Sequence, residues 1–287
     1  MTITEDPGFY RRQVRVGLRE ARKKADRTQV QVATALEWSP SKIIRIENGS
    51  VNVSMTDLKA LLDYYQVREQ DIIEELQHAA RISRKRAWWY EYQEIIRQPF
   101  AQLLSYENAA SAISAYSPTI ISSLLQTTRY AEALRSETVR DSALRARLIE
   151  LMVLRQEKHR TSNDLKTSVV IDEAALRRWV GGPETMAEQI AAVIELARHP
   201  RINIRVLPFS AGAHPAMSGP FILLDSPQGD DDIVFFEGIH GDTISREDSV
   251  LRAEYIAVFK RIQSKSLSQS DSISFLRDVM EEYKAAA

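Results

Sequence analysis

The sequence predicts an α+β multidomain protein, with an N-terminal bundle of five short helices followed by a mixed α/β C-terminal domain. A length of 287 residues corresponds to about two domains of roughly 150 residues each. Up to about residue 80 the apolar residues recur with helical spacing, whereas β-rich runs alternate with helical segments after Pro99. The two parts of the chain also differ in charge.

A net charge of −1 hides this asymmetry. Between Tyr10 and Ser50 ten lysines and arginines oppose four acidic residues, so the segment carries +6 and the rest of the chain −7. Most of these basic residues lie in or just after the first predicted helix, namely Arg11, Arg12, Arg15, Arg19, Arg22, Lys23, Lys24 and Arg27. A basic segment on an acidic body favours phosphate binding by one end of the protein. A solvated helix face is the alternative for the first helix alone.

The composition excludes several classes of site. The chain has no cysteine, which excludes disulfides and thiolate metal sites. Its start lacks the apolar segment of a secretory signal. The longest uncharged run, residues 108–128, holds five serines, three threonines and Pro118, and is too polar to span a membrane. We therefore expect a cytoplasmic protein with no cofactor and no metal.

Capping residues delimit the N-terminal helices. Thr28 is placed to cap the second helix, and Ser39 the third, with Pro40 at its first position where no amide hydrogen is needed. Asn48 and Gly49 end the third helix, because both tolerate a left-handed backbone. Ser54 caps a fourth helix, and a fifth follows around residues 72–76.

The apolar spacing assigns faces to the first three helices. The predicted inward residues are Val14, Leu18, Ala21 and Ala25 on the first helix, Val32, Ala33 and Leu36 on the second, and Ile43 and Ile46 on the third. The third helix then presents Ser41, Lys42 and Arg45 outward. Two short helices joined by a tight turn at Glu37 and Trp38 indicate a helix-turn-helix, whose second helix enters the major groove of DNA.

The pattern TQ…A…S…I…IENG within residues 28–49 resembles the Cro/C1-type (XRE) helix-turn-helix family. The resemblance implies a DNA-binding domain over residues 1–80 with a recognition helix at 40–48. It implies that Gln29 contacts a phosphate and braces the third helix, and that Arg22 pairs with Glu47. Glu37 stands where relatives usually hold glycine. The implied DNA contacts are Thr28, Gln29, Ser39, Ser41, Lys42, Arg45, Asn48 and Ser50.

Arg45 is the strongest candidate for reading a base, because a guanidinium can bond to guanine O6 and N7 together. Ile44 either faces solvent or touches a thymine methyl, and we favour the solvent-facing position.

Residues 81–99 are predicted to form a connecting helix. The segment carries Arg81, Arg84, Lys85 and Arg86 next to an aromatic run, Trp88 to Tyr92. Docking of the second domain is the favoured role of these aromatics, and stacking on nucleic-acid bases is the alternative.

The remainder, residues 100–287, reads as α/β. Helices are predicted over 103–115, 129–134, 142–158, 173–179, from Pro183, over 248–265 and around 273–283. Strands are predicted over 166–171, 202–207, 221–224 and 233–237, the last two joined by an acidic turn at 228–232.

Segments 117–134, 170–190 and 205–227 resemble the DUF5753 domain that follows an XRE helix-turn-helix in many actinobacterial regulators, the WhiJ-like or Scr1-type proteins. Where relatives commonly hold Pro-Gly before LLQT, this chain has Ser122 and Ser123. The resemblance implies a transcription factor, often paired with a small acidic protein of the DUF397 type.

We expect no enzyme activity, since the sequence holds no HExxH, phosphate-loop or nucleophile-elbow motif. The polar residues worth weighing are His214, Glu237, His240, Asp242 and the run 230–232. The loop 212–220 is apolar and rich in glycine and proline, which favours the wall of a pocket or a partner interface carried by His214, Pro215 and Met217.

The sequence thus predicts a sequence-specific DNA-binding transcriptional regulator that acts as a homodimer, with a C-terminal domain that senses a partner protein or a ligand. One alternative is an antitoxin-like protein that holds a small DUF397-type partner, with DNA binding secondary. The other is a small-molecule sensor in the α/β body.

Overall fold

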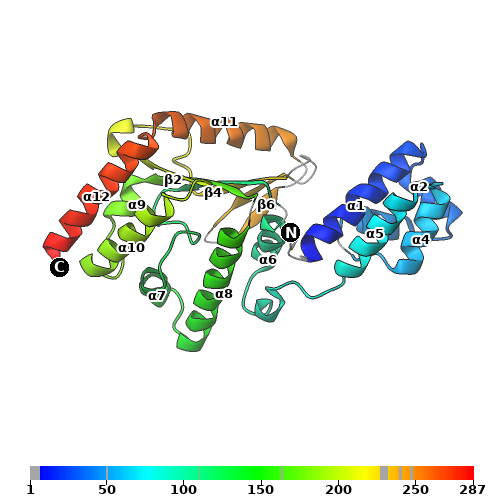
Figure 1. Cartoon of the computed structure of the whole chain (residues 1–287), viewed down its shortest axis with the longest axis horizontal. Helices are drawn as coiled ribbons and strands as arrows, with labels where there is room; N and C mark the ends of the chain where they lie inside the picture. Colours follow the sequence, from blue (N-terminus) through cyan, green and yellow to red (C-terminus); the bar gives the residue numbers. More distant parts are fainter. Residues whose placement is uncertain are drawn as a thin grey trace. The chain divides into compact units, whose positions relative to one another are not determined.

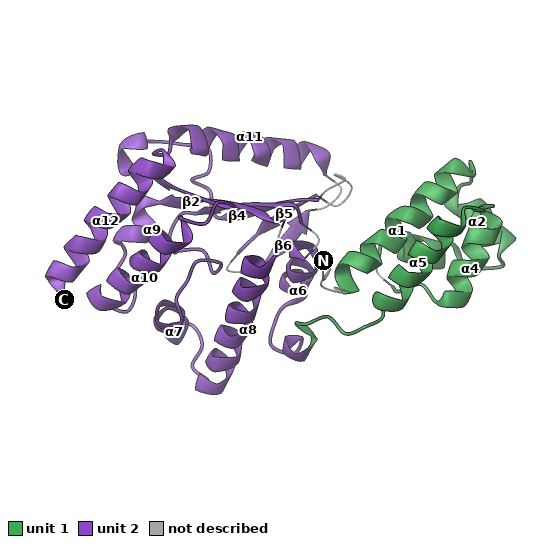
Figure 2. Cartoon of the chain, viewed as in Figure 1, with its two compact units in different colours: residues 1–90 green, residues 91–287 purple. Residues whose placement is uncertain are grey.

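The computed structural model describes residues 7–49, 51–108, 110–162, 164–226, 232–238, 241–245 and 248–287. The chain divides into two compact units, Met1–Tyr90 and Glu91–Ala287 (Figure 2). Each unit has its own hydrophobic core.

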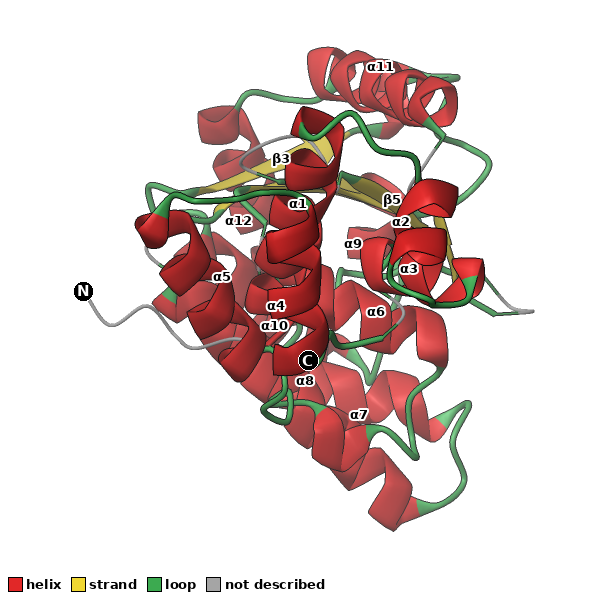
Figure 3. Ribbon diagram, turned by 90° about the vertical axis from the view of Figure 1, so that its right-hand side faces the viewer, coloured by secondary structure: helices red, strands yellow, loops and turns green. Residues whose placement is uncertain are grey.

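Unit 1, Met1–Tyr90, contains five helices in its described residues: α1 (Pro7–Lys24), α2 (Gln29–Ala35), α3 (Pro40–Glu47), α4 (Met55–Tyr64) and α5 (Gln70–Ile82). α2 and α3 lie next to each other beside α1 (Figure 3). The centre of the unit is formed by one fully buried side chain from each of four helices, Leu18, Val32, Ile43 and Leu58. The predicted inward residues of α1 to α3 are buried except Ala25 and Leu36, which are half-buried.

The connecting helix predicted over 81–99 is wrong. α5 ends at Ile82, and only a short 3-10 helix, η1 (Tyr90–Tyr92), interrupts the turns before α6 (Gln98–Glu107). The buried Ser83 ends α5, because its hydroxyl donates to the carbonyl of Ala80 at 2.9 Å. The aromatic residues that follow also have lower helix propensity than alanine or leucine.

Unit 2, Glu91–Ala287, is built on a six-stranded mixed sheet in the order β3-β2-β1-β4-β5-β6. The first three strands pair in parallel and the last three extend the sheet in antiparallel fashion from β1. The strands are β1 (Ala112–Ser117), β2 (Lys166–Asp172), β3 (Ile202–Leu207), β4 (Phe221–Asp225), β5 (Ile233–Phe236) and β6 (Thr243–Ser245).

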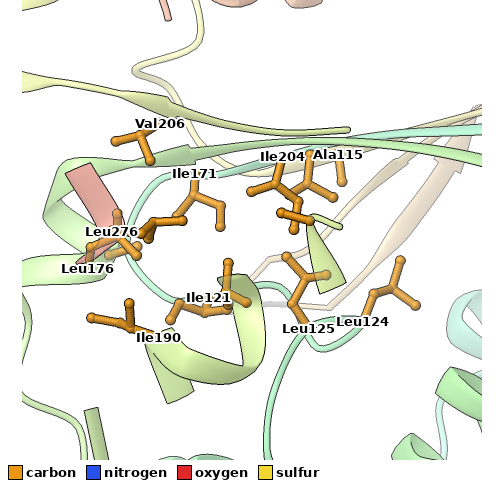
Figure 4. Packing of buried hydrophobic residues seen from close by; sticks show 14 of the residues in the cluster. Ala115, Ile121, Leu124, Leu125, Ile171, Leu176, Ile190, Ile204, Val206 and Leu276 are labelled. Atoms are coloured by element: carbon orange, nitrogen blue, oxygen red, sulfur yellow. The ribbon is translucent and has the colours of Figure 1, made fainter. Parts of the chain in front are cut away.

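Helices cover both faces of this sheet (Figure 1). α11 (Ser249–Lys265) lies on one face. The other face carries α6, α7 (Thr128–Ser136), α8 (Ser142–Thr161), α9 (Glu173–Arg177), α10 (Pro183–Leu196) and α12 (Gln269–Ala286). Successive side chains of β1 point to opposite faces of the sheet. Tyr116 packs in the hydrophobic cluster that contains Phe259 of α11. Its neighbour Ala115 packs in the cluster on the other face, with Ile190 and Leu276 (Figure 4).

The predicted strands within 166–237 form as β2 to β5, although the acidic turn at 228–232 lies outside the described residues except for Asp232. The predicted helix over 103–115 is wrong in its second half. α6 ends at Glu107, and the rest of that segment enters β1, the central strand. Serine and alanine have low strand propensity, so β1 forms because β2 and β4 pair with it on both sides. β6 was not predicted.

No helix in the described part of the chain combines the length and apolar character needed to cross a bilayer.

Candidate nucleic-acid interface

α2 begins with a closed hydrogen-bonded cap. The Thr28 hydroxyl accepts from the amide of Gln31 at 3.2 Å, and the Gln31 side chain accepts from the amide of Thr28 at 2.9 Å. This reciprocal arrangement satisfies two amides at the start of the helix. Thr28 itself is exposed. The cap therefore fixes where α2 starts.

The turn between α2 and α3 depends on Glu37, whose φ is +55°. A non-glycine residue in this left-handed region is strained by about 1 kcal/mol or more. The chain reverses there, and the amide of Trp38 donates to the carbonyl of Ala33 at 2.8 Å. Ser39 and Pro40 then open α3. The Ser39 hydroxyl lies 3.1 Å from that of Ser41 and does not cap the helix.

Glu47, at the end of α3, joins three helices. Its buried carboxylate accepts from Arg22 of α1 at 2.6 Å and 3.0 Å, and from Gln29 of α2 at 2.8 Å. Arg19 adds a bond to the Glu47 carbonyl at 3.1 Å. The hydrogen bonds that Arg22 donates to Glu47 raise the pKa of Arg22. These contacts fix the direction of α3 relative to α1 and α2.

The opposite face of α3 is open. Ser41, Ile44 and Arg45 are exposed, with 45% of Ile44 accessible to solvent. The Arg45 Nε donates to the carbonyl of Ser41 at 3.3 Å, which leans the side chain back along its own helix. A long cation on an exposed face of a clamped helix is suited to contact a ligand outside the protein.

Lys42 differs from the prediction that it points away from the protein. It is half-buried, its Nζ lies 2.7 Å from a carboxylate oxygen of Asp57 on α4, and it sits 3.6 Å from the centre of the Trp38 ring. The sequence spacing gives a residue's helical face, but it does not show which side chain of a later helix reaches it.

Most basic residues of α1 and of the turn after it fall into two groups. Arg11 donates to Asn52, Arg12 is buried, and Arg19 and Arg22 bond to Glu47, so these arginines contribute to the fold. Lys23, Lys24 and Arg27 are exposed. The exposed positive charge of unit 1 is consequently smaller than the basic count of the sequence suggests.

Of the remaining predicted contact residues, Gln29 and Asn48 are half-buried and Ser39 is exposed, whereas Ser50 lies outside the described residues. The structure brings Thr28, Gln29, Ser39, Ser41, Lys42, Arg45 and Asn48 together on α2, α3 and their caps.

Two family profiles match the chain. A helix-turn-helix domain profile matches residues 14–76, which span most of α1 to α5. The profile described as a domain of unknown function, DUF5753, matches residues 100–278 and so more than half of the chain. The chain belongs to the DUF5753 family. Comparisons with curated proteins and with solved structures gave no match. The helix-turn-helix domain indicates a DNA-binding regulator.

In unit 2, the predicted loop residues differ in exposure. His214 is half-buried, with Nε2 at 3.4 Å from the Tyr116 hydroxyl and at 3.7 Å from Asp172. Pro215 and Met217 are exposed, Met217 by 68%. A cavity lies beside β1, and Pro220 of the loop contributes to its wall whereas these three residues do not.

Other polar residues of unit 2 lie at that cavity. Glu237 and Asp242 line it, whereas His240 lies outside the described residues. Within the described residues no group of three histidines or acidic residues is arranged to hold a metal ion.

Proposed function

We propose that this protein is a sequence-specific transcriptional regulator that inserts α3 into the major groove of DNA. The supporting observation is the combination of a clamped inner face and an open outer face on α3. Glu47 is held by Arg22 and Gln29 on the inner side, while Arg45 and Ser41 are exposed on the outer side. A rigid support of this kind keeps a base-reading side chain in position without further ordering on binding.

In this proposal, Arg45 reads guanine through a bidentate contact worth about 1–3 kcal/mol of discrimination. Ser41 lies one turn before it and contacts bases or the adjoining backbone. Gln29 acts mainly by positioning α3, since its side-chain amide already donates to Glu47. Lys42 contacts DNA only after its ammonium leaves Asp57. Ile44 is the apolar neighbour that can meet a thymine methyl.

We also propose that two copies act together on DNA. One recognition helix contacts only a few base pairs, which is too short a sequence to select one site in a genome. A symmetric pair of helices reads two half-sites about 34–36 Å apart, one turn of the double helix.

The proposed role of unit 2 is to sense a signal and change DNA binding by unit 1. Unit 2 is a separate compact body with its own core and a large cavity, which supports a ligand as the signal. The resemblance to WhiJ-like regulators adds a DUF397-type protein as a second partner of this unit.

The test is selection of DNA from a random pool by the full chain, followed by binding measurements on the selected site. Wild type is expected to enrich one site with two related halves, and the logarithm of its affinity is expected to fall linearly with the logarithm of salt concentration. The Arg45→Ala variant is expected to enrich a more degenerate site. Enrichment of the same site by both chains would contradict the role of Arg45.

A further inference from the structure

We propose that unit 2 carries a binding site for a neutral, mainly apolar small molecule whose polar end offers an acceptor oxygen to Arg135 and a hydrogen-bond donor to Glu237. The site is a cavity of about 780 Å³ beside the carboxyl end of β1. This volume falls within the range of about 300–1,000 Å³ typical of small-molecule pockets. The inference deepens the proposed sensing role, but binding itself requires no DNA.

The sheet topology places the cavity where ligands commonly bind. β1 lies between β2 and β4, so the strand order changes direction there. In open α/β sheets, ligands bind outside the carboxyl ends of strands next to such a point. Residues 115–117 at the end of β1 and residues 220–222 at the start of β4 form this edge of the cavity.

The walls are mostly apolar. α8 contributes Leu148, Leu151 and Met152, α7 contributes Leu134, and Phe100 and Ile121 complete the apolar lining. Burial of an apolar ligand against these side chains would contribute roughly 25 cal/mol per Å².

Arg155 also reaches the cavity, but its bonding capacity is largely used. Its guanidinium donates to both carboxylate oxygens of Glu107, and both side chains are only 2% exposed. It also donates to Ser123 at 2.9 Å and lies over the Phe100 ring. Arg155 is consequently part of the wall and leaves the anchoring role to another residue.

Arg135 is that residue. Its Nε is buried and has no hydrogen-bond acceptor within the part of the chain that the structure describes. A buried donor without an acceptor is unfavourable. Burial lowers the pKa of Arg135, and the charge of Glu237 offsets part of this effect. The residue is half-buried and lines the cavity, so an acceptor oxygen on a ligand would bond to the terminal nitrogens of its guanidinium.

Glu237 supplies the complementary end. The residue lines the cavity and is exposed to solvent, while desolvation around its carboxyl and the charges of Asp242 and Glu107 raise its pKa against the opposing charges of Arg155 and Arg135. Its carboxylate can therefore accept from a ligand donor such as a hydroxyl or an amide N–H.

Charge balance selects a neutral ligand. Arg97, Arg135 and Arg155 line the cavity together with Glu237 and Asp242, and Arg155 is paired with the buried Glu107, so three positive groups stand against three acidic ones. The cavity therefore has no net charge that would attract a strongly charged molecule such as a nucleotide. A neutral molecule that carries an acceptor and a donor at separate positions can bond to Arg135 and to Glu237.

The probe for the test is 6-propionyl-2-(dimethylamino)naphthalene, a neutral and apolar ketone whose emission shifts to the blue in apolar surroundings. Its carbonyl tests the acceptor position at Arg135. The full chain is titrated with the probe in the absence of DNA, and the dissociation constant is read from the blue-shifted emission. Wild type is expected to bind it saturably with one site per chain.

Three variants localise the binding. Thr138→Trp places a large ring at an exposed position of the cavity rim and is expected to abolish the blue shift. Arg135→Met removes the donor and is expected to weaken binding about tenfold or more. Arg140→Met, at an exposed arginine that does not line the cavity, is the matched control and is expected to bind like wild type. Near-ultraviolet circular dichroism checks that all variants fold.

Binding that is lost with Thr138→Trp and weakened with Arg135→Met, but kept with Arg140→Met, supports the proposal. Failure of wild type to bind, or equal binding by all four folded chains, would overturn it. Tighter binding of the anionic probe 1-anilinonaphthalene-8-sulfonate would overturn the neutral class of ligand. DNA affinity is measured separately with and without the probe. If the probe binds as expected but DNA affinity does not change, the proposed sensing role is contradicted and the binding site is not.

Discussion

The two units each bury a glutamate that accepts two hydrogen bonds from one arginine, but the pairs differ in exposure and in what surrounds them. In unit 1, Arg22 retains 14% of its side-chain surface, and Glu47 is shared with Gln29. In unit 2, Arg155 and Glu107 are both 2% exposed, and His159 approaches the same carboxylate at 3.2 Å. The first pair supports a helix with an exposed outer face, whereas the second forms the wall of a cavity.

This difference indicates that the buried ion pair has a different role in each unit. Glu47 links three helices, so losing it should disturb the direction of α3 and weaken contacts made on the other face. Arg155 is enclosed, so losing it should leave the buried carboxylate of Glu107 without its guanidinium bonds and act mainly on stability. The predictions below separate these two roles.

The largest effect is expected from Arg155→Met. Removing one partner of a buried ion pair costs about 3–5 kcal/mol, because the remaining charge loses its main compensation, here with His159 still beside Glu107. Hydrogen exchange of the amides in β1 and β2 would report the lowered free energy of opening. Arg160→Met, at an exposed arginine on the same helix, should change it by less than about 0.5 kcal/mol. Equal effects of both changes would show that burial of the pair carries no stability.

Acid should weaken unit 2 through the same pair. Burial alone would raise the pKa of Glu107, but Arg155 and His159 lower it from 4.5 to about 2. A folded-state pKa below the unfolded value stabilises the fold above about pH 4.5, and this contribution is lost as the pH falls toward 2. Its size is about 3 kcal/mol, from roughly 1.4 kcal/mol per pKa unit. Unfolding free energies measured between pH 6 and 2 should fall less steeply in Arg155→Met, and parallel curves would contradict this cause.

Glu47→Gln should have an intermediate effect on stability and a large effect on DNA binding. The amide keeps the shape, but its NH2 group cannot accept, so at least one bond from Arg22 or Gln29 is lost and the other loses its charge assistance, which should cost about 2 kcal/mol. DNA affinity should fall for every sequence alike, because the change alters the support of α3 and leaves the side chains that contact bases unchanged. Gel-shift titrations on a selected site and on unrelated DNA would measure this. A loss confined to the selected site would assign Glu47 a direct reading role.

The smallest effect is expected at the turn. Glu37 has a φ of +55°, a conformation that glycine adopts without strain, so Glu37→Gly should stabilise unit 1 by up to about 1 kcal/mol. Glu20→Gly, at an exposed position inside α1, should destabilise it by about 1 kcal/mol. Thermal unfolding of the two variants should therefore shift in opposite directions, and a shift in the same direction would exclude backbone strain at Glu37.

Much of the fold could be predicted from the sequence where local signals are strong. Capping residues and apolar spacing indicated the helices of unit 1, and alternation or β-branched runs indicated β2 to β5. β1 could not be predicted, because its alanines and serines continue a helical pattern and only pairing with two neighbouring strands makes it extended. The connecting helix failed for a related reason, since Ser83 closes α5 through a local bond.

The candidate sites were less accessible to prediction. Arg45 and its exposed position followed from helical spacing, but the contact between Lys42 and Asp57 depends on how α4 packs. Arg155 falls on the apolar face of its helix, which indicates a buried cation, but Glu107 lies 48 residues away and gave no matching signal. The cavity at the end of β1 required the strand that the sequence did not reveal.

The most direct test of the central claim is a double-mutant cycle between Arg45 and the guanines of the selected DNA site. Affinities are measured for wild type and Arg45→Ala on that site and on sites with each guanine replaced by adenine. A coupling of about 1–3 kcal/mol with one guanine in each half-site is expected. Lys59→Ala, at an exposed lysine on α4, should show no coupling. Independent effects of Arg45→Ala and of every base change would contradict base reading by α3.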